Sequence, residues 1–293
     1  MAGDAVPYHS PGETPSTDRR TPVSPATACR ILMIGDVIGK PGRVAVERRL
    51  PELRAERGID FVVANGENVA GGMGLTESTA EGLLAAGVDV ITSGNHIWDK
   101  REIYPQLERT DRILRPLNYG THEVPGRGWS VVEALDGTHI AVINLQGRSA
   151  MIPIENPFTE VDRLLDEASE PLPPVRVVDF HCELTSEKNA MGIHLDGRAS
   201  IVTGTHTHVP TADERILPGG TAYQSDVGMT GPLHSIIGFD PRTVLPRFIN
   251  GLPTRFEVGG WPVVLNALLV DVDPATGRAL SVERLREIIE DGA

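Results

Sequence analysis

Side chains that can bind metal ions follow the ends of apolar, strand-like stretches at several places in this 293-residue sequence. In each case, polar residues stand directly after a run rich in Ile, Leu, Val and Ala. In open α/β sheets, ligand sites form just beyond the carboxyl ends of the strands, so we expect these residues to gather at one edge of a sheet. The residues concerned are Asp36, Glu67, Asn68, Asn95, His96, His181, His206 and His208.

Each of these residues also has an ordinary structural role when it is taken alone. Asp36 could cap a helix or form a turn, and Glu67 could be a solvated turn residue. Asparagines tolerate positive φ, and a lone histidine is more often a hydrogen-bonded structural residue than a ligand. His206 and His208 fit this reading less well, because residues two apart on an extended segment point to the same side. The combination, in this order, therefore favours a metal site.

The ligand types indicate which metals and which chemistry such a site would support. Histidine nitrogens with carboxylate and amide oxygens suit Fe, Mn, Zn or Co better than Ca or Mg. Six or seven candidate ligands exceed the needs of one tetrahedral site, and a carboxylate such as Glu67 can bridge two ions. Ions roughly 3.5–4 Å apart can hold the attacking and leaving oxygens of a phosphoryl transfer, and a bridging water between them becomes the nucleophile. The sequence thus predicts a dinuclear centre for phosphoryl transfer.

Alternating strands and helices must position these residues in the first part of the chain. The periodicity predicts strands at 31–34, 61–64 and 88–92, with helices at 43–57 and 76–86 between them. This alternation indicates a parallel sheet with helices on both faces.

The remainder of the chain changes character, beginning with Asp136-Gly137, a strong hairpin signal between two strand-like segments. We expect one α/β domain over residues 29–293, with two sheets packed face to face; a small cap from the region of residue 150 or 230 is also compatible. The further expected strands are 129–134, 139–144, 175–180, 201–205, 221–224, 261–271 and 279–286, with helices at 157–170 and 241–248.

Composition narrows the class of protein. A net charge of −13 argues against an extended nucleic-acid interface. Two cysteines make no disulfide framework, and the apolar runs are shorter than the roughly 18 residues of a membrane span, so we expect a cytoplasmic protein without a membrane segment. Residues 1–28 are rich in Pro, Ser, Thr and Gly, which predicts a disordered tail.

The strings around the candidate ligands resemble a known family of enzymes. Taken in order, they resemble the signature of calcineurin-like metallophosphoesterases and, more specifically, the YmdB family of bacterial metallophosphoesterases. The resemblance covers about residues 29 to 286. The matching strings are Ile34-Gly35-Asp36-Val37-Ile38-Gly39, Asn65-Gly66-Glu67-Asn68, Gly94-Asn95-His96-Ile97-Trp98-Asp99-Lys100, Asn144-Leu145-Gln146-Gly147-Arg148, Asp179-Phe180-His181, Gly204-Thr205-His206-Thr207-His208 and Asp226-Val227-Gly228-Met229-Thr230-Gly231-Pro232.

The resemblance implies a calcineurin-like four-layer αββα sandwich, in which two mixed sheets are flanked by helices. It also implies two metal ions, small phosphodiester substrates such as 2′,3′-cAMP, and a homo-oligomer, either a dimer or a tetramer. His96 would protonate the leaving group, a task that suits a histidine at neutral pH. The implied ligands of one ion are Asp36, Glu67, Asn68 and His208, and those of the other are Glu67, Asn95, His181 and His206.

Two departures from the wider superfamily are typical of the YmdB family. Ile38 stands where the superfamily has a histidine, and Glu67 replaces the usual bridging aspartate. The first metal therefore has fewer nitrogen ligands; we expect Fe or Mn, with Zn as an alternative. Arg148 is a further candidate for contact with a phosphate oxygen, and a surface ion pair is the equal alternative for this side chain.

Three other functions compete with this one. A nucleotide-cofactor protein would use Gly35, Gly39 and Gly42 as a phosphate loop, but their spacing does not fit and Asp36 would repel phosphate. A nuclease acting on long nucleic acid conflicts with the acidic composition. A metal-bound regulatory protein with little or no turnover remains the main alternative.

Overall fold

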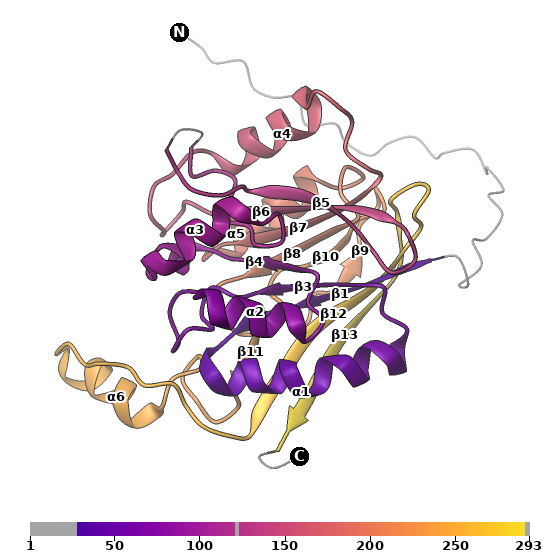
Figure 1. The fold of residues 1–293 in the computed structure, drawn as a ribbon. Helices are drawn as coiled ribbons and strands as arrows, with labels where there is room; N and C mark the ends of the chain where they lie inside the picture. The colour runs from indigo at the N-terminus through magenta and orange to yellow at the C-terminus, as the bar shows by residue number, and fades with distance from the viewer. Residues whose placement is uncertain (1–27, 121–122, 291–293) are drawn as a thin grey trace, which may run out of the picture.

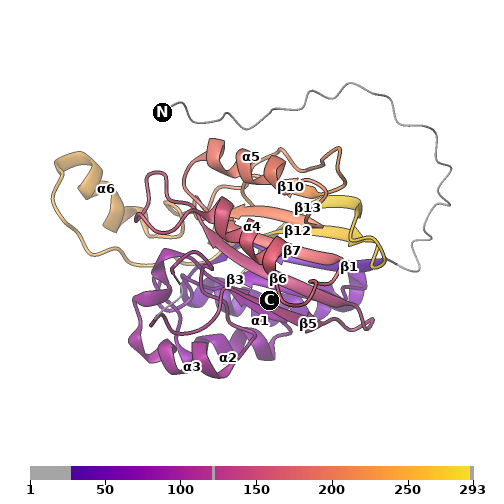
Figure 2. The ribbon, with the colours of Figure 1, turned by 90° about the horizontal axis from the view of Figure 1, so that it is seen from above.

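The computed structural model describes residues 28–120 and 123–290. Two β-sheets pack face to face, and helices cover the outer face of each sheet (Figures 1 and 2). This is the four-layer αββα sandwich that the resemblance implies, and the predicted fold class is confirmed. The expected disordered tail, apart from residue 28, lies outside the described residues.

The first sheet combines strands from the beginning and the end of the described chain. Its order is β2-β11-β12-β1-β3-β4, and β13 pairs with β12. β1, β3 and β4 run parallel, whereas β12 is antiparallel to both β1 and β13. The strands are β1 (Cys29–Ile34), β2 (Asp36–Val37), β3 (Phe61–Asn65), β4 (Val90–Thr92), β11 (Met229–Pro232), β12 (Val263–Val272) and β13 (Ala279–Ile289).

The second sheet has the order β5-β6-β7-β8-β10-β9. β5 and β6 form the predicted hairpin, while β6, β7, β8 and β10 run parallel to one another. The strands are β5 (Trp129–Glu133), β6 (His139–Gln146), β7 (Val175–His181), β8 (Ile201–Thr205), β9 (Arg215–Ile216) and β10 (Ala222–Gln224).

Five of the six α-helices among the described residues form the two outer layers, and α6 projects from the body of the protein (Figures 1 and 2). None of these helices has the length and apolar character needed to cross a bilayer. Three helices lie outside the first sheet: α1 (Gly39–Arg57), α2 (Glu77–Ala85) and α3 (Tyr104–Arg109). Two lie outside the second sheet: α4 (Pro157–Glu167) and α5 (Thr185–His194). The projecting helix α6 is Pro241–Asn250, and the two short 3₁₀ helices are η2 (Asn95–Trp98) and η3 (Arg101–Ile103).

The expectation of helices on both faces of the first sheet is wrong. Leu32 and Ile34 of β1 join the apolar cluster beneath the helices, whereas Ile31 and Met33 join the cluster between the two sheets. Both faces of β1 are therefore apolar. Such a pattern shows that both faces are covered, but it does not distinguish a covering helix from a covering sheet.

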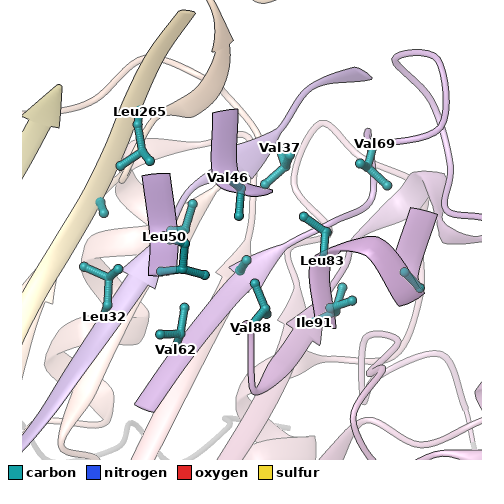
Figure 3. Close-up of a cluster of buried hydrophobic side chains, with 14 of the residues drawn as sticks. Leu32, Val37, Val46, Leu50, Val62, Val69, Leu83, Val88, Ile91 and Leu265 are labelled. Atoms are coloured by element: carbon teal, nitrogen blue, oxygen red, sulfur yellow. The ribbon is translucent and has the colours of Figure 1, made fainter. Parts of the chain in front are cut away.

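Helix α1 is fixed on the first sheet by an apolar stripe. Val46, Leu50 and Leu53 recur at helical spacing and are buried. Leu50 lies beside Leu32 and Val62 of the sheet, and Val46 lies near Val37 (Figure 3). The helix begins four residues before the predicted start, because a proline is tolerated in the first turn. This packing holds the carboxyl ends of β1 and β3, from which the site is built.

Candidate metal centre

The centre of the site joins the two sheets. The Nε2 atom of His181, at the end of β7, lies 3.0 Å from Oε1 of Glu67, just beyond β3. The Nδ1 atom of His206 lies 3.0 Å from the same Nε2 atom. Gly94 makes room for the imidazole, since a Cβ atom at that position would lie 2.0 Å from Cδ2 of His181. Three metal-capable side chains therefore converge on one point.

The remaining predicted ligands of the first ion adjoin this point. The Nδ2 atom of Asn68 lies 3.1 Å from Oε1 of Glu67 and 3.3 Å from Nε2 of His208. Oδ1 of Asp36 lies 3.9 Å from Nε2 of His208 and 3.8 Å from Nδ1 of His181. Glu67 and Asp36 thus lie between the imidazoles, where a carboxylate can be shared by two ions.

The short helix η2 supplies the last two predicted residues. Oδ1 of Asn95 is buried and has no hydrogen-bond partner among the described residues. The backbone N–H of His96 donates to Oε2 of Glu67 over 3.0 Å, which holds η2 against the centre. Nδ1 of His96 lies 2.8 Å from Oδ2 of Asp99, so this carboxylate orients the ring and leaves Nε2 without a bonded partner among the residues that the structure describes.

The geometry expected for His206 and His208 is wrong. Both residues follow the end of β8 in a turn with left-handed backbone, at φ values of 95° and 67°, rather than on an extended segment. Such a backbone costs a non-glycine residue about 1–3 kcal/mol, so the surrounding structure must hold it. Oδ2 of Asp226 accepts hydrogen bonds from the backbone N–H and the hydroxyl of Thr207, at 3.3 and 2.7 Å. Lys188 pairs with the same carboxylate oxygen at 2.5 Å.

The chemistry of this group fits metal ions. Oδ1 of Asp36, like Oδ1 of Asn95, is buried and unpartnered within the described residues, and each is an oxygen atom that a cation could satisfy. Burial raises the pKa of Asp36 to about 6, although His208 and His181 partly offset this effect. Burial and the neighbouring charge of His181 lower the pKa of His206 to about 3, so its imidazole is neutral and available as a ligand at neutral pH.

Buried polar side chains that the sequence did not predict orient the ligands. Thr205 lies 2.9 Å from Nδ1 of His181 and donates from Oγ1 to Asp179 over 2.7 Å. This fixes Nδ1 of His181 as a donor and directs Nε2 toward Glu67. The available signal was Asp179 itself, because a charged residue in the apolar strand β7 must be hydrogen-bonded once it is buried.

Glu183 is a second missed residue, and it contacts the outer side of His206. Its Oε2 atom lies 3.1 Å from Nε2 of His206, the ring nitrogen that does not face His181. Carboxylates in this position commonly orient a histidine that binds metal. The sequence offered no pattern that would separate this glutamate from other surface glutamates.

Arg148 does not join the group. It follows β6, its side chain is exposed, and its backbone N–H donates to Glu187 over 3.2 Å. Contact with a substrate phosphate therefore stays a prediction for this residue.

A cavity of about 370 Å³ opens onto the centre. Its polar lining comes from the predicted site, from Thr207 and from Glu183, and the volume lies within the range of small-molecule sites. A larger hollow of about 650 Å³ lies between α3 and β5, but none of the predicted site residues lines it. The cavity residues from the predicted site are Glu67, Asn68, His96, His206 and His208.

Residues 32–285 match the family of YmdB-like proteins. The chain belongs to this family. A 2′,3′-cyclic-nucleotide 2′-phosphodiesterase of Bacillus subtilis is 47% identical over 256 residues, covering 87% of this chain and 96% of that protein. Membership of the YmdB-like family confirms the resemblance drawn from the motifs.

Solved structures agree with this assignment. A hypothetical protein from Thermus thermophilus is 42% identical with a TM-score of 0.82, covering 89% of this chain and 99% of its own. A novel phosphatase from Mycoplasma pneumoniae is 36% identical with a TM-score of 0.83, covering 90% and 95% of the two chains. This YmdB-like protein is therefore a phosphoric ester hydrolase, as predicted.

Proposed function

We propose that this YmdB-like protein hydrolyses 2′,3′-cyclic nucleotides with a pair of transition-metal ions. The observation that supports this best is the convergence of His181, His206 and Glu67 beside Asp36, which leaves buried oxygen and nitrogen ligands facing one another. The substrate class follows from the relative in Bacillus subtilis, which is named for that activity.

Glu67 is the residue that both ions would share. Ions in these positions would supply Lewis-acid activation of water and neutralise charge on the phosphate. Fe or Mn is the expected metal, because imidazoles are mixed with carboxylate and amide oxygens. Asp36, Asn68 and His208 would complete one set of ligands, and Asn95, His181 and His206 the other.

His96 would supply the proton that hydrolysis requires. Water gives one proton to the solvent and adds to phosphorus as hydroxide, one of the two ester P–O bonds breaks, and the leaving oxygen takes a proton from Nε2 of His96. His96 then regains a proton from the solvent. The product is a nucleoside monophosphate. Asp99 supports this role, because its carboxylate lies 2.8 Å from Nδ1 of the same ring and so orients the imidazole.

The other expectations concern the size of the substrate, the oligomeric state and the cellular location. A small phosphodiester substrate agrees with the dimensions of the cavity. A dimer or tetramer and a cytoplasmic location remain predictions; size-exclusion chromatography with light scattering and fractionation of cells would test them.

The decisive experiment counts metals and turnover in the same preparations. The protein is reconstituted with Mn or Fe, its metals are counted by elemental analysis, and hydrolysis of 2′,3′-cAMP is followed by chromatography of the products. We expect about two metals per chain. Glu67→Gln, which keeps the shape of the side chain, should lose metal and turnover. Glu81→Gln is the matched control on the exposed face of α2 and should retain both.

Two results would contradict the proposal. Failure to bind metal after reconstitution would exclude the dinuclear centre. Two bound metals without turnover of any phosphodiester would favour the regulatory alternative.

A further inference from the structure

The cavity beside the centre has an apolar side as well as a polar one. We call this side the apolar wall; it consists of Ile236, Ile237, Phe239, Val244, Phe248 and Phe256. All six residues belong to the segment between β11 and β12, which includes α6. The hydrolytic chemistry described above uses none of them, so the wall needs a separate explanation.

The part of this segment around Ile237 contacts a predicted metal ligand directly. The backbone carbonyl of Ile237 lies 2.9 Å from Nδ1 of His208. Backbone hydrogen bonds from Asp240 to Glu257, at 2.8 Å, and from Gly259 to Gly238, at 2.9 Å, join the two arms of the segment. The apolar wall therefore has a defined position relative to the predicted metal ligands.

Aromatic rings form the outer part of the wall. Phe239 is buried, and its ring centroid lies 5.6 Å from that of Phe256. Phe248, on α6, also lines the cavity, although 75% of its surface is exposed. Helix α6 stands away from the two sheets in both views (Figures 1 and 2), so Phe248 can be reached from the solvent.

A cavity of this kind fits a ligand with an anionic end and a flat apolar end. The phosphate of such a ligand would meet the predicted metal ligands, while the flat group would lie against the aromatic rings. A nucleotide has both features, and aromatic side chains stack on any of the four bases because every base has a π-face. Apolar side chains offer no hydrogen bonds by which one base is distinguished from another.

We propose that the apolar wall binds the base of the nucleotide, with Phe248 as the principal stacking residue. This inference rests on the proposed function, which names the substrate class but not the residues that hold the base. It assigns recognition of the base to the segment between β11 and β12. It also predicts acceptance of all four bases, with purines preferred because they stack more extensively.

Steady-state kinetics with two substrates tests the wall. The substrates are 2′,3′-cAMP and the 2′,3′-cyclic phosphate of 1-O-methylribose, which has no base. Phe248→Ala should raise KM for 2′,3′-cAMP about 10- to 100-fold and leave the kinetics of the base-free substrate unchanged. Phe248→Tyr, which keeps the ring, should restore the wild-type KM.

Ile249→Ala is the matched control. Ile249 follows Phe248 on α6 and is 81% exposed, but it does not line the cavity. This variant should leave both substrates unaffected. Equal losses on both substrates in Phe248→Ala, an unchanged KM for 2′,3′-cAMP, or the same effect in Ile249→Ala would overturn the proposal. Light scattering on each variant would show whether such an effect comes from a contact between copies of the chain.

Binding of adenosine separates this inference from the proposed function. Adenosine has no phosphate, so saturation-transfer NMR measures contact with the base independently of metal and turnover. We expect a signal from the adenine protons with the unaltered protein and its loss in Phe248→Ala. That result, without turnover of either cyclic phosphate, would refute the proposed activity and retain the base site. An adenosine signal that is absent from the unaltered protein or unchanged in Phe248→Ala would refute the base site.

Discussion

The Nε2 atom of His181 lies 3.0 Å from Oε1 of Glu67, although His181 ends β7 of the second sheet and Glu67 follows β3 of the first. Burial by itself would raise the pKa of Glu67 and lower that of His181. Their pairing reverses both effects: the pKa of Glu67 falls to about 2, and that of His181 rises to about 9. In the metal-free protein, the positive charge of protonated His181 therefore compensates the negative charge of Glu67, the carboxylate that metal ions would otherwise share.

The first prediction is that metal binding releases a proton near pH 7. A metal ion binds only neutral imidazole, so His181 must lose its proton when the ion enters. Calorimetric titration in buffers with different ionisation enthalpies measures the number of protons released, and we expect a value near one at pH 7. Binding heats that do not depend on the buffer would contradict this prediction.

The same pair predicts how the stability of the metal-free protein depends on pH. The folded pKa of His181, about 9, lies above its ordinary value of 6.5, so its stabilising contribution is complete below pH 6.5. That contribution is lost as the pH rises through 9. The Tm of the metal-free protein should therefore fall between pH 6.5 and 9 more than that of the metal-loaded protein, in which His181 carries no proton. Differential scanning calorimetry of both forms compares the two slopes, and parallel curves would be inconsistent with a buried protonated His181.

The second prediction concerns His96 as the proton donor. His96→Ala should lower kcat for 2′,3′-cAMP by about 100- to 10,000-fold while both metals stay bound. Asp99→Asn should cause a smaller loss, because the ring remains but is less well oriented. Elemental analysis and initial rates measure both effects.

The leaving group supplies the control for this role. Nitrophenolate leaves without protonation, so His96→Ala should lose much less activity on bis(p-nitrophenyl) phosphate than on 2′,3′-cAMP. Equal losses on both substrates would assign His96 to binding rather than to proton transfer.

The positions of the site residues at the ends of strands could be predicted from the sequence, because a strand end is marked by local features of the chain. The apolar runs before Asp36 and His181 end where the strands end, but β1 and β7 belong to different sheets, so the packing of the two sheets brings these residues together. Helix α5 was missed for a physical reason. It buries Lys188, Met191 and Gly192, which have helical spacing, but only Met191 is a large apolar residue, so the sequence shows no apolar stripe.

The contacts that orient the ligands could not be predicted from the sequence. The turn of His206 and His208 has left-handed backbone at both histidines. It is held by hydrogen bonds from Thr207 to Asp226, which lies 19 residues further along the chain. In the sequence, Glu183 looks like any other acidic residue in a loop. Only the folded structure shows that it contacts His206. Such contacts depend on long-range packing, which local periodicity does not encode.

The third prediction assigns Glu183 a positioning role. Its carboxylate contacts Nε2 of His206 and orients the opposite ring nitrogen toward the centre. Glu183→Gln should weaken metal binding about 10- to 100-fold, because partners of this kind set ligand orientation and basicity. Competition with a metallochromic chelator measures the affinity, and Glu81→Gln should leave it unchanged. Rescue of kcat at saturating metal would distinguish weakened metal binding from a direct catalytic role.

The fourth prediction concerns the buried ion pair between Lys188 and Asp226. The two side chains are 3% and 2% exposed, their charged atoms lie 2.5 Å apart, and the carboxylate also holds Thr207 between the two histidines. Lys188→Met leaves a buried carboxylate unpaired, so the free energy of unfolding should fall by about 3–5 kcal/mol. Lys188→Met combined with Asp226→Asn should recover part of this loss, because neither of these two positions then carries a buried charge.

A surface pair provides the comparison for this prediction. Arg57 and Glu283 also form an ion pair, but both are partly exposed, so Arg57→Met should lower the free energy of unfolding by no more than about 1 kcal/mol. Urea denaturation of the metal-free proteins measures all the variants, and metal affinity is measured on the same samples. Because Asp226 holds the His206–His208 turn, Lys188→Met should also weaken metal binding, whereas Arg57→Met should not. Equal losses of stability in the two single variants would mean that burial adds nothing to the Lys188–Asp226 pair.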